Sequence, residues 1–308
     1  MSRRRDSSLK TEAEWLRAMI ATPLLARAPG SHHVVVAGPK GGTAKTTTAA
    51  LLGLNLASLR SEIVAVVDAN THLGTLRRRL VSPADRPTRS FGDLCARSLV
   101  GDVLPEWSAL APYVDVVAGL RVFRCLTPNP AEVESLTGVE FGAGLALLRR
   151  AAQIVVSDIG VSANGPVGVA ALANASTLVL ATELAQDSLE MTIEMVSALA
   201  GQALSYRPDP DCWSAVSDGR FSPLVEGAVV VVAPGRQLHE DSRRGRADLT
   251  AMTEWLRAVC GGGVYLVGSD DHLALGDLIV PEQLRPETAV AHLRAAAAVA
   301  ARLALGEG

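Results

Sequence analysis

The stretch "GPKGGTAKTTTA" at residues 38–49 follows the apolar run "HVVVA" at 33–37 and leads into a helical pattern that continues to residue 60. A buried strand, a glycine-rich turn and a helix that begins with Lys-Thr is the layout of a phosphate-binding loop. In such a loop the glycines let the backbone approach an anion, and the helix N-terminus contributes a positive dipole end. The stretch therefore predicts a phosphate site inside an α/β fold.

Lysine is scarce in this chain, and the loop contains two of the three lysines. Apart from Lys10, Lys40 and Lys45, the other 26 of the 29 basic residues are arginine. A compact ammonium group suits a crowded phosphate pocket, where a planar guanidinium does not fit. We expect Lys45 to bind phosphate, and we expect the hydroxyl of Thr46 to ligate a magnesium ion shared with the phosphates.

The loop departs from the strict pattern GxxxxGK[ST], because Pro39 stands six positions before Lys45 and Ala44 directly precedes it. The segment "KGGTAKT" at 40–46 instead resembles the deviant phosphate loop of the ParA/MinD superfamily, in which an additional lysine precedes the glycine pair. The resemblance implies ATP as the nucleotide. It assigns nucleotide binding to Pro39, Lys40, Gly41, Gly42, Thr43, Ala44, Lys45, Thr46 and Thr47.

The same resemblance implies a role for each lysine in a homodimer that forms in the ATP state. Lys40 would reach across an ATP-sandwiched dimer to the phosphates of the partner, while Lys45 would act within its own subunit. Slow hydrolysis would then return the dimer to monomers. Ala44 replaces the glycine that is commoner in the family, so a positive φ at this position would strain its methyl group.

Two aspartates end predicted strands farther along the chain. Asp68 closes "IVAVVDA" at 63–69 and resembles the family's Asp-x-Asp motif, with Asn70 at the second acidic position. Asp158 ends "QIVVSDI" at 153–159, which resembles a Walker B strand. Ligands of open α/β sheets bind at the carboxyl ends of the strands. The alternative is that each aspartate is an ordinary residue at a strand end.

The resemblance gives these aspartates roles. Thr46, Asp68 and Asp158 would hold Mg²⁺ directly or through its water, and Asp68 would also orient the attacking water. Lys40, Lys45 and Asp68 are thus the predicted catalytic residues. Gly160 would form a tight turn near the γ-phosphate.

Valine-rich runs alternate with helical patterns along the chain. Continuous apolar runs predict strands that are buried on both faces. They lie at 33–37, 63–69, 114–119, 153–159, 176–182, 228–233 and 264–268, and the helical patterns between them lie at 44–60, 142–152, 188–204 and 248–260. We expect a doubly wound, mostly parallel sheet of seven or eight strands with helices on both faces, as in P-loop NTPases.

The domain organisation follows from this pattern. Residues 1–30 are expected to form an N-terminal tail with a short helix at 12–20, and residues 31–308 to form the ATPase domain. The segments 70–112 and 206–227 are expected to be long, partner-facing connections. The alanine-rich C-terminal pattern at 288–305 predicts a core-packed helix instead of a membrane anchor.

Composition bounds the location and the partners. The formal net charge is −3, and the four cysteines are dispersed without a paired motif. A uniformly basic nucleic-acid surface is therefore excluded, and no metal or disulfide framework is suggested. The N-terminus shows no signal peptide, so we expect a cytoplasmic protein without a membrane anchor.

The resemblance leaves the additional partner open. Nonspecific DNA could contact Arg236, Arg243, Arg244 and Arg246, although acidic residues between them also fit an ordinary solvated surface. A protein that stimulates hydrolysis is the other candidate. The N-terminal region looks like that of stand-alone actinobacterial ATPases, some of which accompany type VII secretion systems.

Two functions follow from these observations. The first is an ATP-dependent dimerisation switch with slow, partner-stimulated hydrolysis, acting in positioning, DNA partitioning or secretion-system assembly. The second is a nucleotide-bound interaction scaffold that does not hydrolyse ATP. Three features motivate the scaffold, namely Ala44, Asn70 and the pair Ala233-Pro234. This pair occupies the place where the family often has an asparagine that reads adenine.

Overall fold

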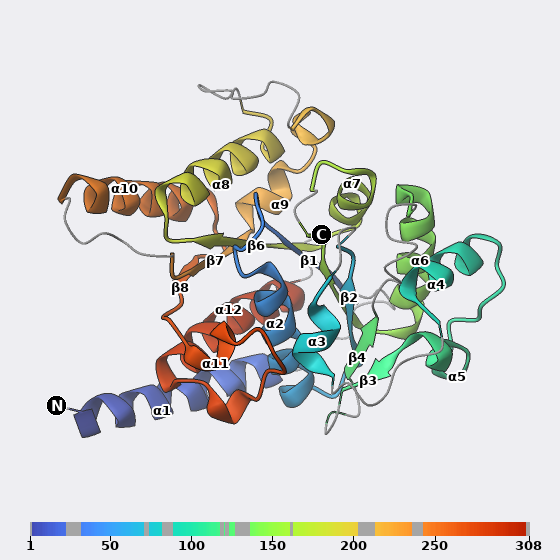
Figure 1. Cartoon of the computed structure of the whole chain (residues 1–308), viewed down its shortest axis with the longest axis horizontal. Coiled ribbons are helices and arrows are strands. Elements are labelled where there is room, and N and C mark those ends of the chain that lie inside the picture. The colour runs from blue at the N-terminus through green and yellow to red at the C-terminus, as the bar shows by residue number, and fades with distance from the viewer. Residues whose placement is uncertain are drawn as a thin grey trace.

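The computed structural model describes residues 2–22, 32–70, 74–81, 89–117, 120, 123–126, 136–160, 163–202, 213–235 and 243–305. Within these residues, eight strands form one sheet (Figure 1). The strands are β1 (His32–Ala37), β2 (Val64–Asp68), β3 (Asp115–Val116), β4 (Phe123–Leu126), β5 (Ile154–Asp158), β6 (Thr177–Glu183), β7 (Val229–Ala233) and β8 (Val264–Leu266).

The strand order places β1 inside the sheet. The order is β3-β4-β2-β5-β1-β6-β7-β8, and every neighbouring pair is parallel except β3 with β4. The phosphate-loop stretch leaves the carboxyl end of β1, between β5 and β6. The predicted doubly wound, mostly parallel sheet with helices on both faces is confirmed, and it has eight strands.

Two layers of helices cover the sheet (Figure 1). Side chains of one sheet face pack with α4 (Phe91–Leu99), α5 (Trp107–Leu110), α6 (Gly138–Ala151), α7 (Pro166–Ala173), α8 (Gln186–Leu199), α9 (Ser222–Glu226) and α10 (Arg243–Val259). The other face packs with α1 (Ser2–Ala21), α2 (Lys45–Leu59), α3 (Leu76–Leu80) and α12 (Pro286–Leu305). Because β2, β5 and β7 are buried along their whole lengths, their valine runs carry no alternating polar face.

The edge beside β4 differs from the prediction. Within the described part of 114–119, where a strand was expected, β3 covers Asp115–Val116, and it pairs antiparallel with β4. Strand β4 was not predicted, because its four residues "FRCL" include an arginine and do not form a continuous apolar run. The long connection at 70–112 contains α3, α4 and α5, and the connection at 206–227 contains α9.

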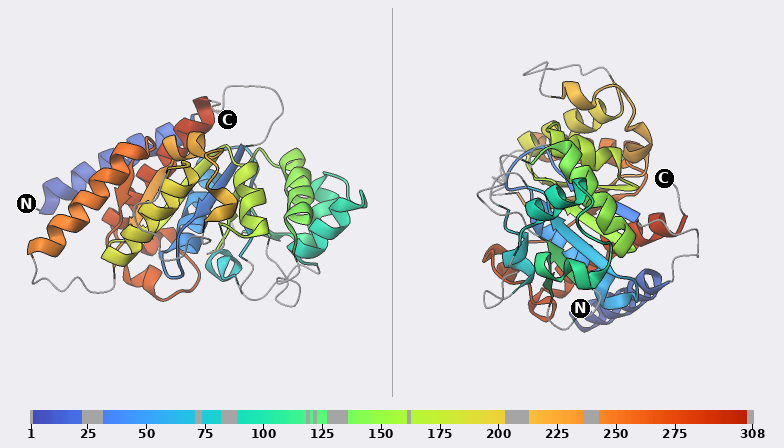
Figure 2. Two further views of the ribbon diagram at one scale, coloured as in Figure 1. Left: turned by 90° about the horizontal axis from the view of Figure 1, so that it is seen from above. Right: turned by 90° about the vertical axis from the view of Figure 1, so that its right-hand side faces the viewer.

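Helix α1 is also longer than expected, since it begins at Ser2 instead of residue 12. Leu16 and Ile20 are buried against the body of the protein. Arg294 of α12 donates two hydrogen bonds to Glu12, at 2.6 and 2.8 Å, and Arg60 donates to the carbonyls of Ile20 and Thr22. The first turns of α1 project at the end of the molecule that α10 also reaches (Figure 2). The boundary between an N-terminal segment at residues 1–30 and an ATPase domain at residues 31–308 stays a prediction.

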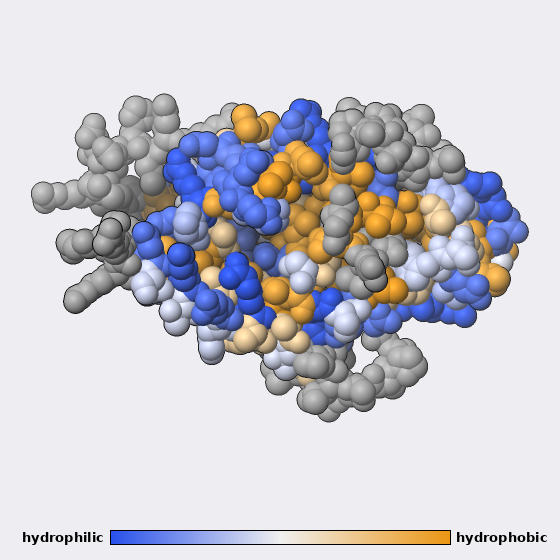
Figure 3. Space-filling view, turned by 90° about the horizontal axis from the view of Figure 1, so that it is seen from below, coloured by the Kyte–Doolittle hydropathy of each residue, from blue (hydrophilic) through white to orange (hydrophobic). Residues whose placement is uncertain are grey.

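Helix α12 is packed into the core, as expected. Most of its apolar residues between Val290 and Leu303 are buried, and they pack against α2 and the sheet. On the side of the molecule seen from below, hydrophobic residues reach the surface in the middle and hydrophilic residues surround them (Figure 3). Within the described residues, no helix combines the length and the apolar composition needed to span a bilayer.

Candidate phosphate and metal site

The loop between β1 and α2 has the backbone of an anion cradle. Gly42 has a φ of 84°, and Ala44 directly before the helix has a φ of 62° and a ψ of 21°. The amide of Thr48 donates the first helical hydrogen bond to the Ala44 carbonyl at 2.8 Å. At Gly38, a side chain would overlap the Ala181 carbonyl of β6. The loop is therefore held tightly against the neighbouring strand.

Ala44 is strained. Among the described residues it alone combines a side chain with a positive φ, in the left-handed region that favours glycine. Such a conformation costs an L-residue about 1–2 kcal/mol. Ala44 stands where the family commonly has glycine, and the backbone strain expected from this replacement is present. The strained residue directly precedes α2, which begins with Lys45.

Lys45 lies inside the loop, with 7% of the residue exposed. Its Nζ donates to the Lys40 carbonyl at 2.5 Å and to Thr43 Oγ1 at 3.4 Å. Burial lowers the pKa of Lys45, and the nearby Asp158 partly offsets that shift. Both acceptors are neutral oxygens, so an anion that reached the loop would be a stronger partner for the ammonium group.

Thr46 and Asp158 face each other across the site. The Thr46 hydroxyl donates to Asp158 Oδ2 at 2.5 Å, while Oδ1 is buried and accepts no hydrogen bond from the described residues. Burial raises the pKa of Asp158, and the Thr46 hydroxyl and Lys45 act in the opposite direction. We call Thr43–Thr46 together with Asp158 the inner half of the site.

Asp68 lies beside Asp158, because the two residues are register partners on β2 and β5. Asp68 is fully buried, and its oxygens accept hydrogen bonds from the amides of Asn70 at 3.2 Å and Leu76 at 3.1 Å. Burial first, and then the charge of Asp158, raises its pKa to about 7. A side chain at Gly74 would overlap the Asp68 carboxylate. Asp68 thus closes the turn that leads into α3.

These residues fit a magnesium ion that also binds a phosphate. Mg²⁺ in nucleotide sites uses one or two carboxylates, keeps several waters and takes its remaining oxygens from the phosphates. Within the described residues, no cluster of three or more His, Cys, Asp or Glu side chains could hold a metal ion by itself. The unpartnered Asp158 Oδ1 and the Thr46 hydroxyl supply oxygens next to the loop. These oxygens fit a magnesium site that phosphate oxygens complete, and they do not suffice for a site made of protein ligands alone.

The segment Lys40–Gly42, which we call the outer half, is more exposed. Gly41 and Gly42 are exposed, whereas Pro39 before them and Thr47 after the loop are buried. Lys40 Nζ forms an ion pair with Asp187 Oδ2 of α8 at 2.5 Å. The structure thus brings Lys45, Thr46, Asp68 and Asp158 together. The Lys40 ammonium points away from them, toward Asp187.

Sequence reasoning missed two residues of this neighbourhood, Asp187 and Gly74. An aspartate in the first turn of a helix is ordinarily explained by the helix dipole, so nothing in the sequence indicated its pairing with Lys40. Gly160, which was predicted to form a tight turn, has a φ of 61°, and a Cβ there would lie 2.6 Å from Asn70 Oδ1. The predicted DNA contact at Arg236 lies outside the described residues, as do the side chains of Arg243, Arg244 and Arg246.

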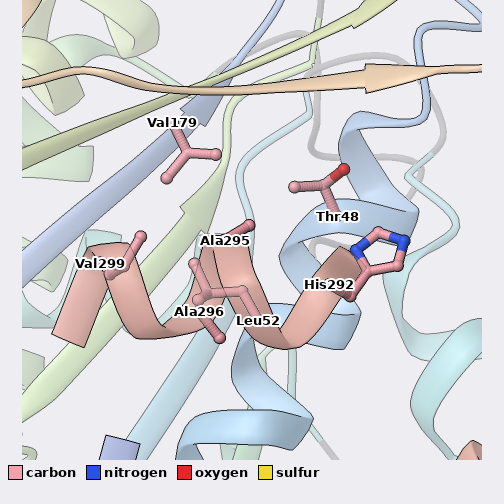
Figure 4. A pocket seen from close by; sticks show the side chains of 7 residues that line it. All are labelled: Thr48, Leu52, Val179, His292, Ala295, Ala296 and Val299. Atoms are coloured by element: carbon pink, nitrogen blue, oxygen red, sulfur yellow. The ribbon is translucent and has the colours of Figure 1, made fainter. Parts of the chain in front are cut away.

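A small cavity lies behind the site, between α2, α12 and β6 (Figure 4). Apolar side chains form most of its wall, and Thr48 and His292 lie at one end. Its volume of about 10 Å³ is room for no more than one water molecule. This cavity is too small for a nucleotide.

Solved structures share this fold. The ParA-family ATPase of Chlorobium tepidum superposes with a TM-score of 0.62 at 14% identity, covering 88% of this chain and 99% of that one. The septum site-determining protein MinD of Pyrococcus horikoshii, solved with Mg-ADP, gives a TM-score of 0.55 at 17% identity, covering 87% and 94%. The chain therefore has the fold of the ParA/MinD superfamily of P-loop ATPases, as its loop predicted.

Sequence comparison finds a more local similarity. The ESX-1 secretion-associated protein EspI of Mycobacterium tuberculosis is 32% identical over 129 residues, which are 42% of this chain and 16% of EspI. No protein-family model matches the chain.

Proposed function

We propose that this protein is an ATP-dependent dimerisation switch of the ParA/MinD type, which binds Mg-ATP and hydrolyses it slowly. The observation that carries the proposal is the inner half of the site. There Lys45, Thr46 and Asp158 converge, and Asp158 keeps one buried oxygen without a described partner. A buried, unpaired carboxylate oxygen beside a lysine and a helix N-terminus fits a metal-bound phosphate.

Each residue has a defined task in this proposal. Lys45 exchanges the Lys40 carbonyl for a phosphate oxygen, while Thr46 and Asp158 hold Mg²⁺. When bound, Mg²⁺ neutralises charge on the phosphates and keeps them in one orientation. Asp68 orients the attacking water, after at least one of its oxygens is released from the backbone amide of Asn70 or Leu76. The protein contributes mainly positioning and charge.

Lys40 belongs to the second part of the proposal, the dimer. Its ammonium lies outside the cradle of its own subunit, in the exposed outer half of the loop. After leaving Asp187, it would bind phosphates that a second copy brings to this face. We place the switch in the cytoplasm, with nonspecific DNA or a protein as the stimulating partner.

The similar proteins support two cellular settings for this proposal. MinD is a septum site-determining protein, which supports intracellular positioning or partitioning as the broad role. EspI is a secretion-associated protein, which supports secretion-system assembly as a second setting. The shared segment covers only 16% of EspI, so we extend its setting to this chain as a proposal alone.

A nucleotide-bound scaffold without hydrolysis is the second candidate, and two observations favour it. Ala44 strains the loop, and Asp68 has both oxygens bound to backbone amides. A site in which these two features persisted with ATP bound would hold the nucleotide without positioning water. The scaffold and the switch share the same binding residues and differ only in turnover.

Phosphate release by the full chain separates the two candidates. With Mg-ATP the switch releases phosphate slowly, and addition of DNA or a partner protein accelerates the release. The Lys45→Ala variant is the background control. Nucleotide binding without phosphate release under any of these conditions would establish the scaffold, and absence of binding would contradict both.

A further inference from the structure

Helix α3 is short, so its position depends on contacts with other parts of the chain. It has five residues, and Leu76 and Leu80 at its two ends are buried. One turn of helix has too few internal hydrogen bonds to be stable by itself. The amide of Leu76 donates to Asp68 Oδ2 at 3.1 Å. The contacts that fix α3 therefore also fix the Asp68 carboxylate.

Arg79 joins α3 to the connection between β8 and α12. Its guanidinium donates to the carbonyl of Leu273 at 3.0 Å, and its own carbonyl accepts a hydrogen bond from the amide of Ile279 at 2.8 Å. The last carbonyls of a helix lack partners within the helix, so the second bond satisfies one of them. Leu273 belongs to α11 (Asp271–Ala274), which lies beside α3 (Figure 1). Arg79 is thus bound to this connection through both its side chain and its backbone.

The connection is bonded internally around the buried residue Asp270. Its Oδ1 accepts hydrogen bonds from the amides of His272 and Leu273, at 3.0 and 3.3 Å. Its Oδ2 accepts one from the amide of Arg285 at 2.8 Å. His272 Nε2 accepts a further bond from the amide of Val280 at 2.8 Å. The groups that contact Arg79 therefore belong to one internally bonded segment, and Asp270 holds this segment together.

This arrangement connects two regions that are far apart in the sequence, since Arg79 and Leu273 are separated by 194 positions. A displacement of α3 would remove the Leu76 amide from Asp68 Oδ2. The other oxygen, Oδ1, accepts its hydrogen bond from the amide of Asn70, which lies before α3. While Leu76 holds Oδ2, Oδ1 is the oxygen that can exchange its amide donor for a water.

We propose that Arg79 is a positioning residue. It holds α3 against the connection between β8 and α12, so that Leu76 keeps Asp68 Oδ2 and Oδ1 serves the attacking water. The hold on α3 concerns the nucleotide-free chain. The role of Oδ1 rests on the proposed hydrolysis of Mg-ATP, so the two parts have separate tests.

Hydrogen exchange of the nucleotide-free full chain, located by fragmentation mass spectrometry, tests the hold on α3. Arg79→Ala should increase the exchange rate of the Leu76 amide about fivefold or more, because local opening of α3 becomes easier. The matched control is Arg78→Ala, since Arg78 is exposed and its ion pair with Asp277 spans 3.7 Å. This control loses the same charge and should change the rate by about twofold at most. An equal Leu76 exchange rate in Arg79→Ala and in the wild type would overturn the proposal.

A variant in the connection tests the same contact from the other side. Asp270→Ala removes the carboxylate that holds the segment together and should also increase the Leu76 exchange rate. The double variant with Arg79→Ala should exceed the faster single variant by about twofold at most, because both changes act on one contact. Fully additive effects would overturn the link between Asp270 and Arg79. The amides of α6 should exchange as in the wild type, and a parallel increase there would show loss of global stability instead of release of α3.

Phosphate release tests the effect on turnover. Arg79→Ala should lower the turnover rate about tenfold and change the affinity for Mg-ATP by about twofold at most, because Asp68 is displaced while the phosphate loop is intact. Arg79→Lys retains a charged donor for the Leu273 carbonyl and should recover most of the rate, whereas Arg78→Ala should match the wild type. Unchanged turnover in Arg79→Ala, together with faster exchange at Leu76, would overturn the role in hydrolysis. A wild type that binds Mg-ATP without releasing phosphate would contradict the proposed switch itself, and the exchange experiment would still decide the hold on α3.

Discussion

The inner and outer halves of the phosphate site differ in the properties that decide binding. In the inner half Lys45 is buried, and the Thr46 hydroxyl is bonded to a buried carboxylate. In the outer half Gly41 is exposed, and a Cβ there would meet nothing within 4 Å. Two lysines five positions apart thus have different surroundings. This difference fits our proposal that the inner half serves the subunit's own nucleotide and the outer half serves a second molecule.

The largest expected effect separates the two lysines. Lys45→Ala should weaken Mg-ATP binding about 100-fold or more, because it removes the charged donor from the centre of the cradle. Lys40→Ala should change the affinity of the monomer by about threefold at most, since its ammonium lies on Asp187. Titration calorimetry measures both. An equal loss of Mg-ATP affinity in the two variants would show that the inner and outer halves do not differ in nucleotide binding.

Gly74 offers a way to disturb Asp68 without touching the lysines. In Gly74→Ala the new methyl group would overlap the Asp68 carboxylate, so we expect phosphate release to fall about 100-fold with smaller effects on binding. Gly142→Ala in α6 is the matched control, because a Cβ there meets nothing within 4 Å. If phosphate release from Gly74→Ala equals that of the wild type, the position of Asp68 is irrelevant to turnover.

The inner half of the site was largely predictable from sequence, because it depends on local order. A strand, two glycines and Lys-Thr fix the path of the chain, and Asp68 and Asp158 meet because parallel strands bring their carboxyl ends to one edge. The pairing of Lys40 with Asp187 was not predictable. It joins residues 147 positions apart, and it depends on how α8 packs beside the loop.

The fold, like the site, was predictable from sequence only where it depends on local patterns. Continuous apolar runs predicted β1, β2, β5, β6, β7 and the edge strand β8, since strands buried on both faces leave such a pattern. The short strand β4 lies between β3 and β2 and includes an arginine, so its place in the sheet follows from pairing with these two strands. Local patterns thus identify the centre of the sheet better than its margins.

The pH dependence of the free energy of unfolding tests the raised pKa of Asp68. The folded state raises the pKa of Asp68 from 3.8 to about 7, so between these pH values the folded protein binds more protons than the unfolded chain. The free energy of unfolding of the nucleotide-free protein should therefore fall as pH rises from about 4 to 7, by at most about 4 kcal/mol, and then level off. Urea denaturation at several pH values should show a smaller fall in Asp68→Asn. An equal fall in both proteins would show that Asp68 titrates normally.

The smallest expected effect concerns Ala44, the strained residue of the inner half. Ala44→Gly relieves a positive φ but increases the freedom of the unfolded chain, so we expect a net gain of about 1 kcal/mol or less in the free energy of unfolding. Denaturation in urea measures this change. A loss of stability would mean that the methyl group contributes packing that outweighs its strain.

The most direct test of the central claim is molar mass by light scattering, with Mg-ATP compared with Mg-ADP. We expect the monomer mass of 32.1 kDa in ADP and twice that mass in ATP. Lys40→Ala should stay monomeric in both nucleotides, although it still binds ATP. The same mass for the wild type in both nucleotides would contradict the claim that the outer half of the phosphate loop responds to ATP by binding a second copy.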